Sequence, residues 1–153
     1  MPVRRMFKFL VGVTVVLCTS YACGDPGFRM RPIGWDKISN NEWSKQFGDF
    51  SIQSRGIEGL IGHDSIDPNL QVRSNSKPIL VESASLITAT GTLPGRIYGD
   101  VIPPSTSSYH LPIEWVVEHD RPAYEVLGSR CEIHLLLKVG TQPRDIRIEY
   151  EKY

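Results

Sequence analysis

This sequence has few cysteines. It also lacks long apolar runs and an excess of charge of either sign. The 153 residues include three cysteines, and 17 Lys and Arg balance 17 Asp and Glu, so the formal net charge is zero. No stretch approaches the roughly 20 apolar residues of a spanning helix, which excludes a polytopic membrane protein. Because basic residues do not outnumber acidic ones, the composition argues against a dedicated nucleic-acid binder. Hydrophobic residues make up 41% of the chain, which excludes a wholly disordered protein, and the length suits one domain.

Motifs that carry catalysis or hold a metal are also missing. The sequence has no His-x-His, Cys-x-x-Cys or His-Glu-x-x-His spacing, no Gly-x-Ser-x-Gly elbow and no phosphate-binding loop. The four histidines are His63, His110, His119 and His134. Of these, His134 shares an outward strand face with Glu132, but two ligands make a weak metal site. We therefore expect no catalytic residue, no metal and no cofactor. A small hydrolase ranks as a third class of function, after the two classes that the rest of the sequence favours.

The first 22 residues have the three parts of a secretory signal peptide. Three basic residues lie within the first eight, an apolar run follows over residues 9–17, and residues 19–22 form a more polar exit. The cations favour the cytoplasmic side, and nine apolar residues are too few to span a bilayer stably. We therefore expect residues 1–22 to be removed after they have directed the chain out of the cytosol.

The junction Ser20-Tyr21-Ala22-Cys23 resembles two known signals. It is similar to the lipobox of bacterial envelope lipoproteins, in which the cysteine is lipidated and becomes the first residue. The usual lipobox has Leu where this chain has Ser20. The junction also resembles an ordinary signal-peptidase site, with small residues at Ser20 and Ala22. Both interpretations place the cut between Ala22 and Cys23. The first implies a lipid anchor on Cys23, and the second implies a periplasmic or secreted protein. A third alternative is a leader that stays uncleaved as an anchor.

Cysteine pairing depends on this choice. Cys18 lies in the leader, so the mature chain keeps Cys23 and Cys131. If Cys23 carries lipid, Cys131 is a lone thiol, which is tolerated when it is buried. If Cys23 is unmodified, the two cysteines could form a disulfide in an oxidising compartment.

After the leader, we expect a tether and then a short helix. Residues 23–35 are rich in Gly and Pro without periodicity, so they are expected to form a tether whose far end is fixed by Phe28 and Trp35. Residues 39–42 fit a capping box, in which Ser39 is the N-cap. Trp43 and Phe47 would then share one helix face as core residues, and Gly48 would end the helix.

Beyond residue 49 the pattern is that of short strands. Apolar residues alternate with polar ones over 111–117, 131–139 and 146–150, which indicates strands with one buried face. This alternation places Cys131 on a buried face. Residues 140–145 are expected to join the last two strands as a hairpin loop, and the run 93–96 is expected to form a type II turn at Gly95.

The whole pattern predicts an all-β fold. Residues 36–153 would form an antiparallel β-sandwich of about seven or eight strands, preceded by one short N-terminal helix. The stretches VRSNSKPILVESASLIT (72–88) and VIPPSTSSYHLPIEWVV (101–117) resemble the small immunoglobulin-like sandwiches of bacterial envelope lipoproteins. That resemblance implies an immunoglobulin-like sandwich.

Together these features predict a non-enzymatic, extracytoplasmic protein of the cell envelope. It would act as an interaction or assembly accessory module. Its partners would be the membrane, through lipid on Cys23, and an unidentified envelope protein, with no nucleic acid. The alternative is a secreted ligand-binding domain without a lipid, for a small molecule, a glycan or a metal. The candidate binding loops are 100–110, with Tyr109, and 118–130, with Tyr124.

Overall fold

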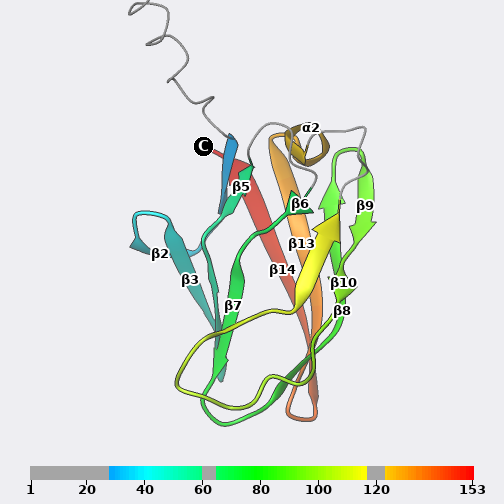
Figure 1. Cartoon of the computed structure of the whole chain (residues 1–153). Helices are drawn as coiled ribbons and strands as arrows, with labels where there is room; N and C mark the ends of the chain where they lie inside the picture. The colour runs from blue at the N-terminus through cyan, green and yellow to red at the C-terminus, as the bar shows by residue number, and fades with distance from the viewer. Residues whose placement is uncertain (1–27, 60–64, 117–122) are drawn as a thin grey trace, which may run out of the picture.

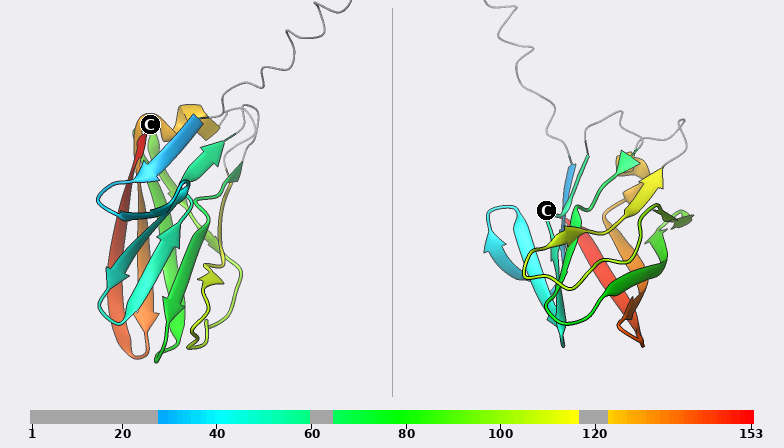
Figure 2. Two further views of the ribbon diagram at one scale, coloured as in Figure 1. Left: turned by 90° about the vertical axis from the view of Figure 1, so that its left-hand side faces the viewer. Right: turned by 60° about the horizontal axis from the view of Figure 1, so that its bottom comes forward.

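A computed structural model describes residues 28–59, 65–116 and 123–153. The fold is all-β, as the sequence predicts, and every strand pairing in these ranges is antiparallel (Figure 1). Two large sheets face each other, and a small sheet of three strands lies beside β8 and β9 at one side (Figure 2). The architecture is therefore sandwich-like.

The strands of the larger sheet combine both ends of the described chain. In spatial order they are β5 (Ile57–Gly59), β1 (Phe28–Pro32), β14 (Gln142–Lys152), β13 (Arg130–Val139), β8 (Ile79–Thr88) and β9 (Gly91–Pro94). The five-stranded sheet is β11 (Tyr109–His110), β7 (Leu70–Ser74), β4 (Phe50–Ser54), β3 (Glu42–Phe47) and β2 (Asp36–Ser39). The small sheet is β10 (Arg96–Ile97), β12 (Ile113–Val116) and β6 (Ser65–Ile66). These ranges contain fourteen strand segments, more than the seven or eight expected, because several strands have only two or three residues.

The core lies between the two large sheets, and one hydroxyl network joins them across it. Ser54 on β4 and Tyr150 on β14 are fully buried and share a hydrogen bond of 2.9 Å. The Ser54 hydroxyl also donates to the Pro68 carbonyl at 3.0 Å and accepts from the Gly56 N–H at 3.0 Å. Because its one proton goes to Pro68, Tyr150 must be the donor to Ser54, and every hydrogen-bonding position of Ser54 is used.

The hairpin of β13 and β14 confirms the alternation read from the sequence. Every second residue of β13 from Cys131 to Val139 is buried, and Ile146, Ile148 and Tyr150 are buried on β14. The connecting loop is shorter than expected, because the strands are joined through Gly140 and Thr141 alone. Gly140 has a φ of +62°, which an L side chain rarely adopts, so a two-residue turn suffices.

Strand β8 is one long strand with a bulge. Leu136 of β13 lies opposite Ser83 and Leu137 lies opposite Val81, so Glu82 is the extra residue. The bulge moves the buried face from the odd-numbered Val81 to the even-numbered Ala84. This change of parity explains why the run 79–90 shows no single alternation in the sequence.

The short helix expected at residues 39–48 is wrong, because these residues belong to the hairpins of β2, β3 and β4. Ser39 and Glu42 flank the turn between β2 and β3, with 3.5 Å between the hydroxyl and a carboxylate oxygen. Trp43 and Phe47 do share a face, but residues four apart share a face in a strand as well as in a helix. Gly48 does adopt a left-handed conformation, with a φ of +69°, in the next turn.

Within the described residues the α-helix is α2 (Ala123–Leu127), which lies in one of the two loops considered for binding. Its residue Leu127 is fully buried, and Tyr124 packs against Phe28 with ring centroids 6.4 Å apart. The short helix α2 is therefore part of the packed end of the sandwich.

Part of the range expected as a tether, residues 23–35, is a strand instead, and residues 23–27 lie outside the described residues. Residues 28–32 form β1, which pairs with both β14 and β5 in the larger sheet. Phe28 and Trp35 are buried, as expected for residues that attach the segment to the domain. The sequence FRMRP hid a strand because it has only two apolar positions before a proline, and its partners lie far away in the chain.

The type II turn expected at Gly95 is wrong as well. Gly95 has no positive φ, and its N–H donates to the Ala84 carbonyl at 2.8 Å. A Cβ at this position would lie 2.8 Å from Ile113 and 2.9 Å from the indole nitrogen of Trp115. Gly95 is therefore required by a close approach between strands and not by a turn.

Candidate functional site

The residues proposed for cleavage and lipidation, Ala22 and Cys23, lie outside the described residues. In the ranges that the structure covers, no helix is long and apolar enough to cross a membrane. The structural evidence on function therefore comes from Cys131, the histidines and one pocket.

Cys131 is a buried free thiol, as the alternation predicted. Its sulfur lies 3.9 Å from the sulfur of Met30 on β1. Burial raises the pKa of the Cys131 thiol to about 12, so the reactive thiolate is suppressed at neutral pH. This thiol is therefore a packing group and a poor nucleophile.

The outward face of β13 and β14 carries alternating charges. His134 lies 2.7 Å from a carboxylate oxygen of Asp145, and Glu132 lies 3.4 Å from Arg147. Glu132 and His134 thus have cross-strand partners on β14 and do not converge on one point. Within the described ranges, no group of three or more His, Cys, Asp or Glu side chains could hold a metal. His63 and His119 lie outside those ranges.

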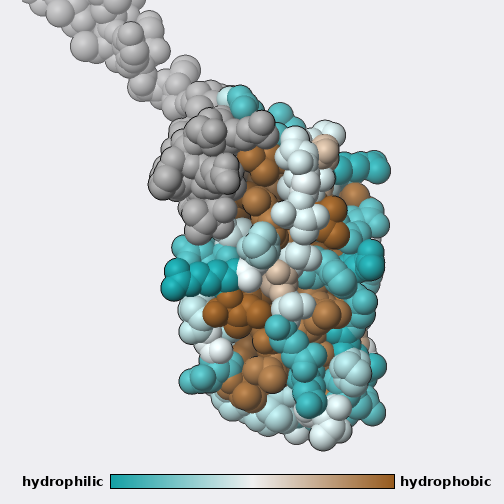
Figure 3. All heavy atoms as spheres, turned by 90° about the vertical axis from the view of Figure 1, so that its right-hand side faces the viewer, coloured by the Kyte–Doolittle hydropathy of each residue, from teal (hydrophilic) through white to brown (hydrophobic). Residues whose placement is uncertain are grey.

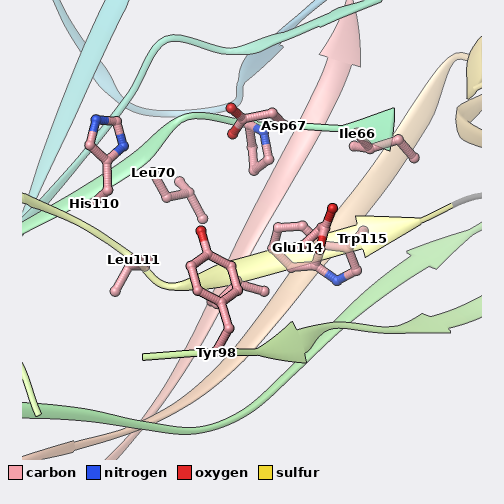
Figure 4. A pocket seen from close by; sticks show the side chains of 10 residues that line it. Ile66, Asp67, Leu70, Tyr98, His110, Leu111, Glu114 and Trp115 are labelled. Atoms are coloured by element: carbon pink, nitrogen blue, oxygen red, sulfur yellow. The ribbon is translucent and has the colours of Figure 1, made fainter. Parts of the chain in front are cut away.

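A pocket of about 470 Å³ lies where the chain crosses from β11 to β12. Its walls come from the β6–β7 segment, from Tyr98 after β10 and from the segment that joins β11 to β12 (Figure 4). The lining residues are Ile66, Asp67, Pro68, Leu70, Tyr98, His110, Leu111, Ile113, Glu114 and Trp115. This volume is within the range of small-molecule sites.

The wall formed by residues 67–69 is held rigidly. The Asn69 N–H donates to a carboxylate oxygen of Asp67 at 2.7 Å, and Asn69 adopts a φ of +48°. This is the turn that the sequence Asp67-Pro68-Asn69 predicts. The Pro68 carbonyl accepts the hydroxyl of Ser54, so the network between the two large sheets also fixes this wall.

The floor and the rim of the pocket are aromatic. Trp115 is 1% exposed, and its indole nitrogen has no hydrogen-bond partner within the part of the chain described. Tyr98 is 66% exposed and extends between β12 and β7 (Figure 4). At the other rim the ring of His110 lies 3.4 Å from the side-chain nitrogen of Gln71. The pocket thus offers an exposed ring, two carboxylates and an imidazole beside an apolar floor.

The exposed apolar residues on the side of β9 and β10 form separate patches. Figure 3 shows several apolar regions divided by polar ones on this side. The most exposed large apolar residues of the described chain include Tyr98 and Val101, at 66% and 53%. Large apolar patches are the usual mark of a protein interface, whereas a pocket of this volume suits a smaller ligand.

Sequence reasoning identified part of this pocket. The loop 100–110 contributes His110 to the lining, whereas Tyr109 is exposed and pairs through its backbone with Val72. Residues 118–122 of the second loop lie outside the described residues. Nothing in the sequence marks Asp67, Tyr98 and Trp115 as neighbours, because they lie on separate segments that only the tertiary fold brings together.

Comparison with family models, with curated proteins and with solved structures finds no significant match to this chain.

Proposed function

We propose that this chain is a non-enzymatic protein of the cell envelope, anchored through lipid on Cys23. Its body would be an immunoglobulin-like β-sandwich that acts as an interaction or assembly accessory module for another envelope protein. The observation that carries the proposal is the order of the first 23 residues, from basic start to apolar run to Ser20-Tyr21-Ala22-Cys23.

The cysteine environment supports lipid on Cys23 over a disulfide. Cys131 is 6% exposed, and its sulfur lies 3.9 Å from the sulfur of Met30, so little of the thiol is accessible for a bond to Cys23. A disulfide needs the two Cα atoms within about 7 Å in compatible directions. With Cys131 committed to the core, Cys23 is the cysteine of the mature chain left for modification.

The mass of the mature N-terminus tests this proposal. We expect a chain that starts at Cys23, carries a diacyl or triacyl mass and is found in the membrane fraction. Cys23→Ser should lose the acyl mass, whereas Cys131→Ala, the matched cysteine control, should keep it. An unmodified Cys23 in a soluble fraction would refute the anchor.

The pocket favours a second candidate, a secreted domain that binds a small ligand without a lipid. Its volume and its exposed Tyr98 ring are the supporting observations. A thermal-shift panel of sugars and charged small molecules, measured on the mature chain, tests it. A hit should be lost in Tyr98→Ala and retained in Tyr124→Ala, a matched tyrosine outside the pocket. Equal retention in both variants would place binding elsewhere.

A further inference from the structure

We infer that the end of the sandwich where β1 begins lies against the bilayer, and that the opposite hairpin end points away from it. This inference rests on the proposed lipid on Cys23. Its structural basis is β1, which shortens the connection between anchor and body. The proposed partner of this end is the headgroup region of the membrane.

The reach of the anchor is short. Because β1 starts at Phe28, only residues 24–27 separate the sandwich from Cys23. A fully extended chain spans at most about 3.6 Å per residue, so Phe28 lies within ~18 Å of the lipidated residue. A tether that ran to residue 35 would have more than doubled this reach.

The end that contains Phe28 is defined by three contacts and is called the anchor end. The Phe28 ring packs on Tyr124 of α2, the Tyr153 N–H donates to the Arg29 carbonyl, and the Lys152 N–H donates to the Ser129 carbonyl. Figure 1 shows β1, α2 and the C-terminus at the same end of the sandwich.

The hairpin end lies at the other end of β14. Lys77 contacts the carboxylate of Asp49 at 2.7 Å, and the Gly140 N–H donates to the Pro78 carbonyl at 2.8 Å. These contacts gather the turns that follow β3, β7 and β13. Strand β14 has 11 residues, so the two ends are ~35 Å apart. The hairpin end can therefore lie ~50 Å from the anchor when the sandwich stands upright.

The side chains at the anchor end suit a lipid headgroup region. Tyr124 and Tyr153 expose their rings, and Arg130 and Lys152 are exposed beside them. Tyrosine rings and basic side chains are enriched where proteins meet the membrane–water interface. Glu151 pairs with Arg130 at 3.9 Å, so the attraction of Arg130 to anionic lipid is partly offset. The orientation of the sandwich therefore depends on the lipid anchor and on the two tyrosine rings.

Energy transfer to the membrane tests the orientation on the intact lipidated protein. Ser129→Cys places a dye at the anchor end and Thr141→Cys places one at the hairpin end, both at exposed positions. Native Cys131 is buried and does not compete for the dye. In phosphatidylcholine vesicles with acceptor headgroups, we expect strong transfer from position 129 and weak transfer from position 141.

Two controls separate the possible outcomes. Inserting about twenty Gly and Ser residues after residue 27 adds ~25 Å of mean reach and should reduce transfer from position 129. Equal transfer from both positions would mean that the sandwich lies flat, and stronger transfer from position 141 would mean that it is inverted, and either result overturns the inference. Absence of an acyl mass on Cys23 would instead refute the anchor itself, and the orientation with it.

Discussion

Gly56 provides the sharpest test of the packing, because it is constrained in two ways. Its φ of +75° lies in the left-handed region, and a Cβ there would lie 2.3 Å from the backbone carbonyl oxygen of Met30. The same Cβ would lie 3.3 Å from the ring of Trp43. Real Cβ atoms do not approach a backbone oxygen so closely, so β1 or the Gly56 segment must move in Gly56→Ala.

Gly34 allows the two constraints to be separated. It has nearly the same φ, +73°, but a Cβ there would meet no atom within 4 Å. Gly34→Ala should therefore lower the free energy of unfolding only by the cost of a left-handed backbone, about 1–2 kcal/mol. Gly56→Ala adds overpacking, worth about 1–3 kcal/mol, and weakens the bond from its N–H to Ser54. We expect a total loss of roughly 2–5 kcal/mol.

Urea unfolding of the mature chain, followed by tryptophan fluorescence, measures both variants against the parent. The midpoint should fall markedly further in Gly56→Ala than in Gly34→Ala, with similar slopes. Equal losses would show that the contact between Gly56 and Met30 contributes nothing, and would refute the close packing of β1 on the chain after β4.

Two further predictions concern polar groups. Ser54→Ala should cost about 1–3 kcal/mol, because it leaves the hydroxyl of Tyr150 and the N–H of Gly56 buried without this partner. In a double-mutant cycle with Tyr150→Phe, additive losses would argue against a direct bond. The hydrogen-bonded ion pair with Lys77 lowers the pKa of Asp49 from its ordinary 3.8. In acid the unfolded state therefore binds more protons than the folded state. The contribution of this pair to stability is present above the ordinary pKa and is lost as the pH falls through the lowered pKa. In acid titrations Asp49→Asn should flatten the slope of unfolding free energy below pH 4, and an unchanged slope would contradict the pairing.

The sequence was most informative where the alternation is long. Nine residues from Cys131 to Val139 keep a period of two, so the buried face follows directly, and the structure confirms it. The register with β14 did not follow, because the expected loop of residues 140–145 is only Gly140 and Thr141. The run 79–88 is as long but was ambiguous, because the bulge at Glu82 reverses the parity midway. Bulges depend on pairing with another strand and leave little trace in one sequence.

Local signals failed where two structures satisfy them equally. A spacing of four places Trp43 and Phe47 on one face of a helix or of a strand, and Ser39 with Glu42 can cap a helix or flank a hairpin turn. Tertiary pairing with β4 decided the outcome. Most of the pocket escaped prediction for a related reason, since Asp67, Tyr98 and Trp115 become neighbours only after the small sheet has formed.

Strand β1 connects the fold to the proposed function. The sulfur of its Met30 lies 3.9 Å from the buried sulfur of Cys131, and this burial favours Cys23 as the cysteine that carries the proposed lipid. The carbonyl of the same residue occupies the space that a side chain at Gly56 would need. Because β1 lies between β5 and β14, it cannot also serve as a flexible spacer. If Cys23 carries lipid as proposed, the short connection to this core strand would determine which end of the sandwich approaches the bilayer, and would limit which surfaces an envelope partner can reach.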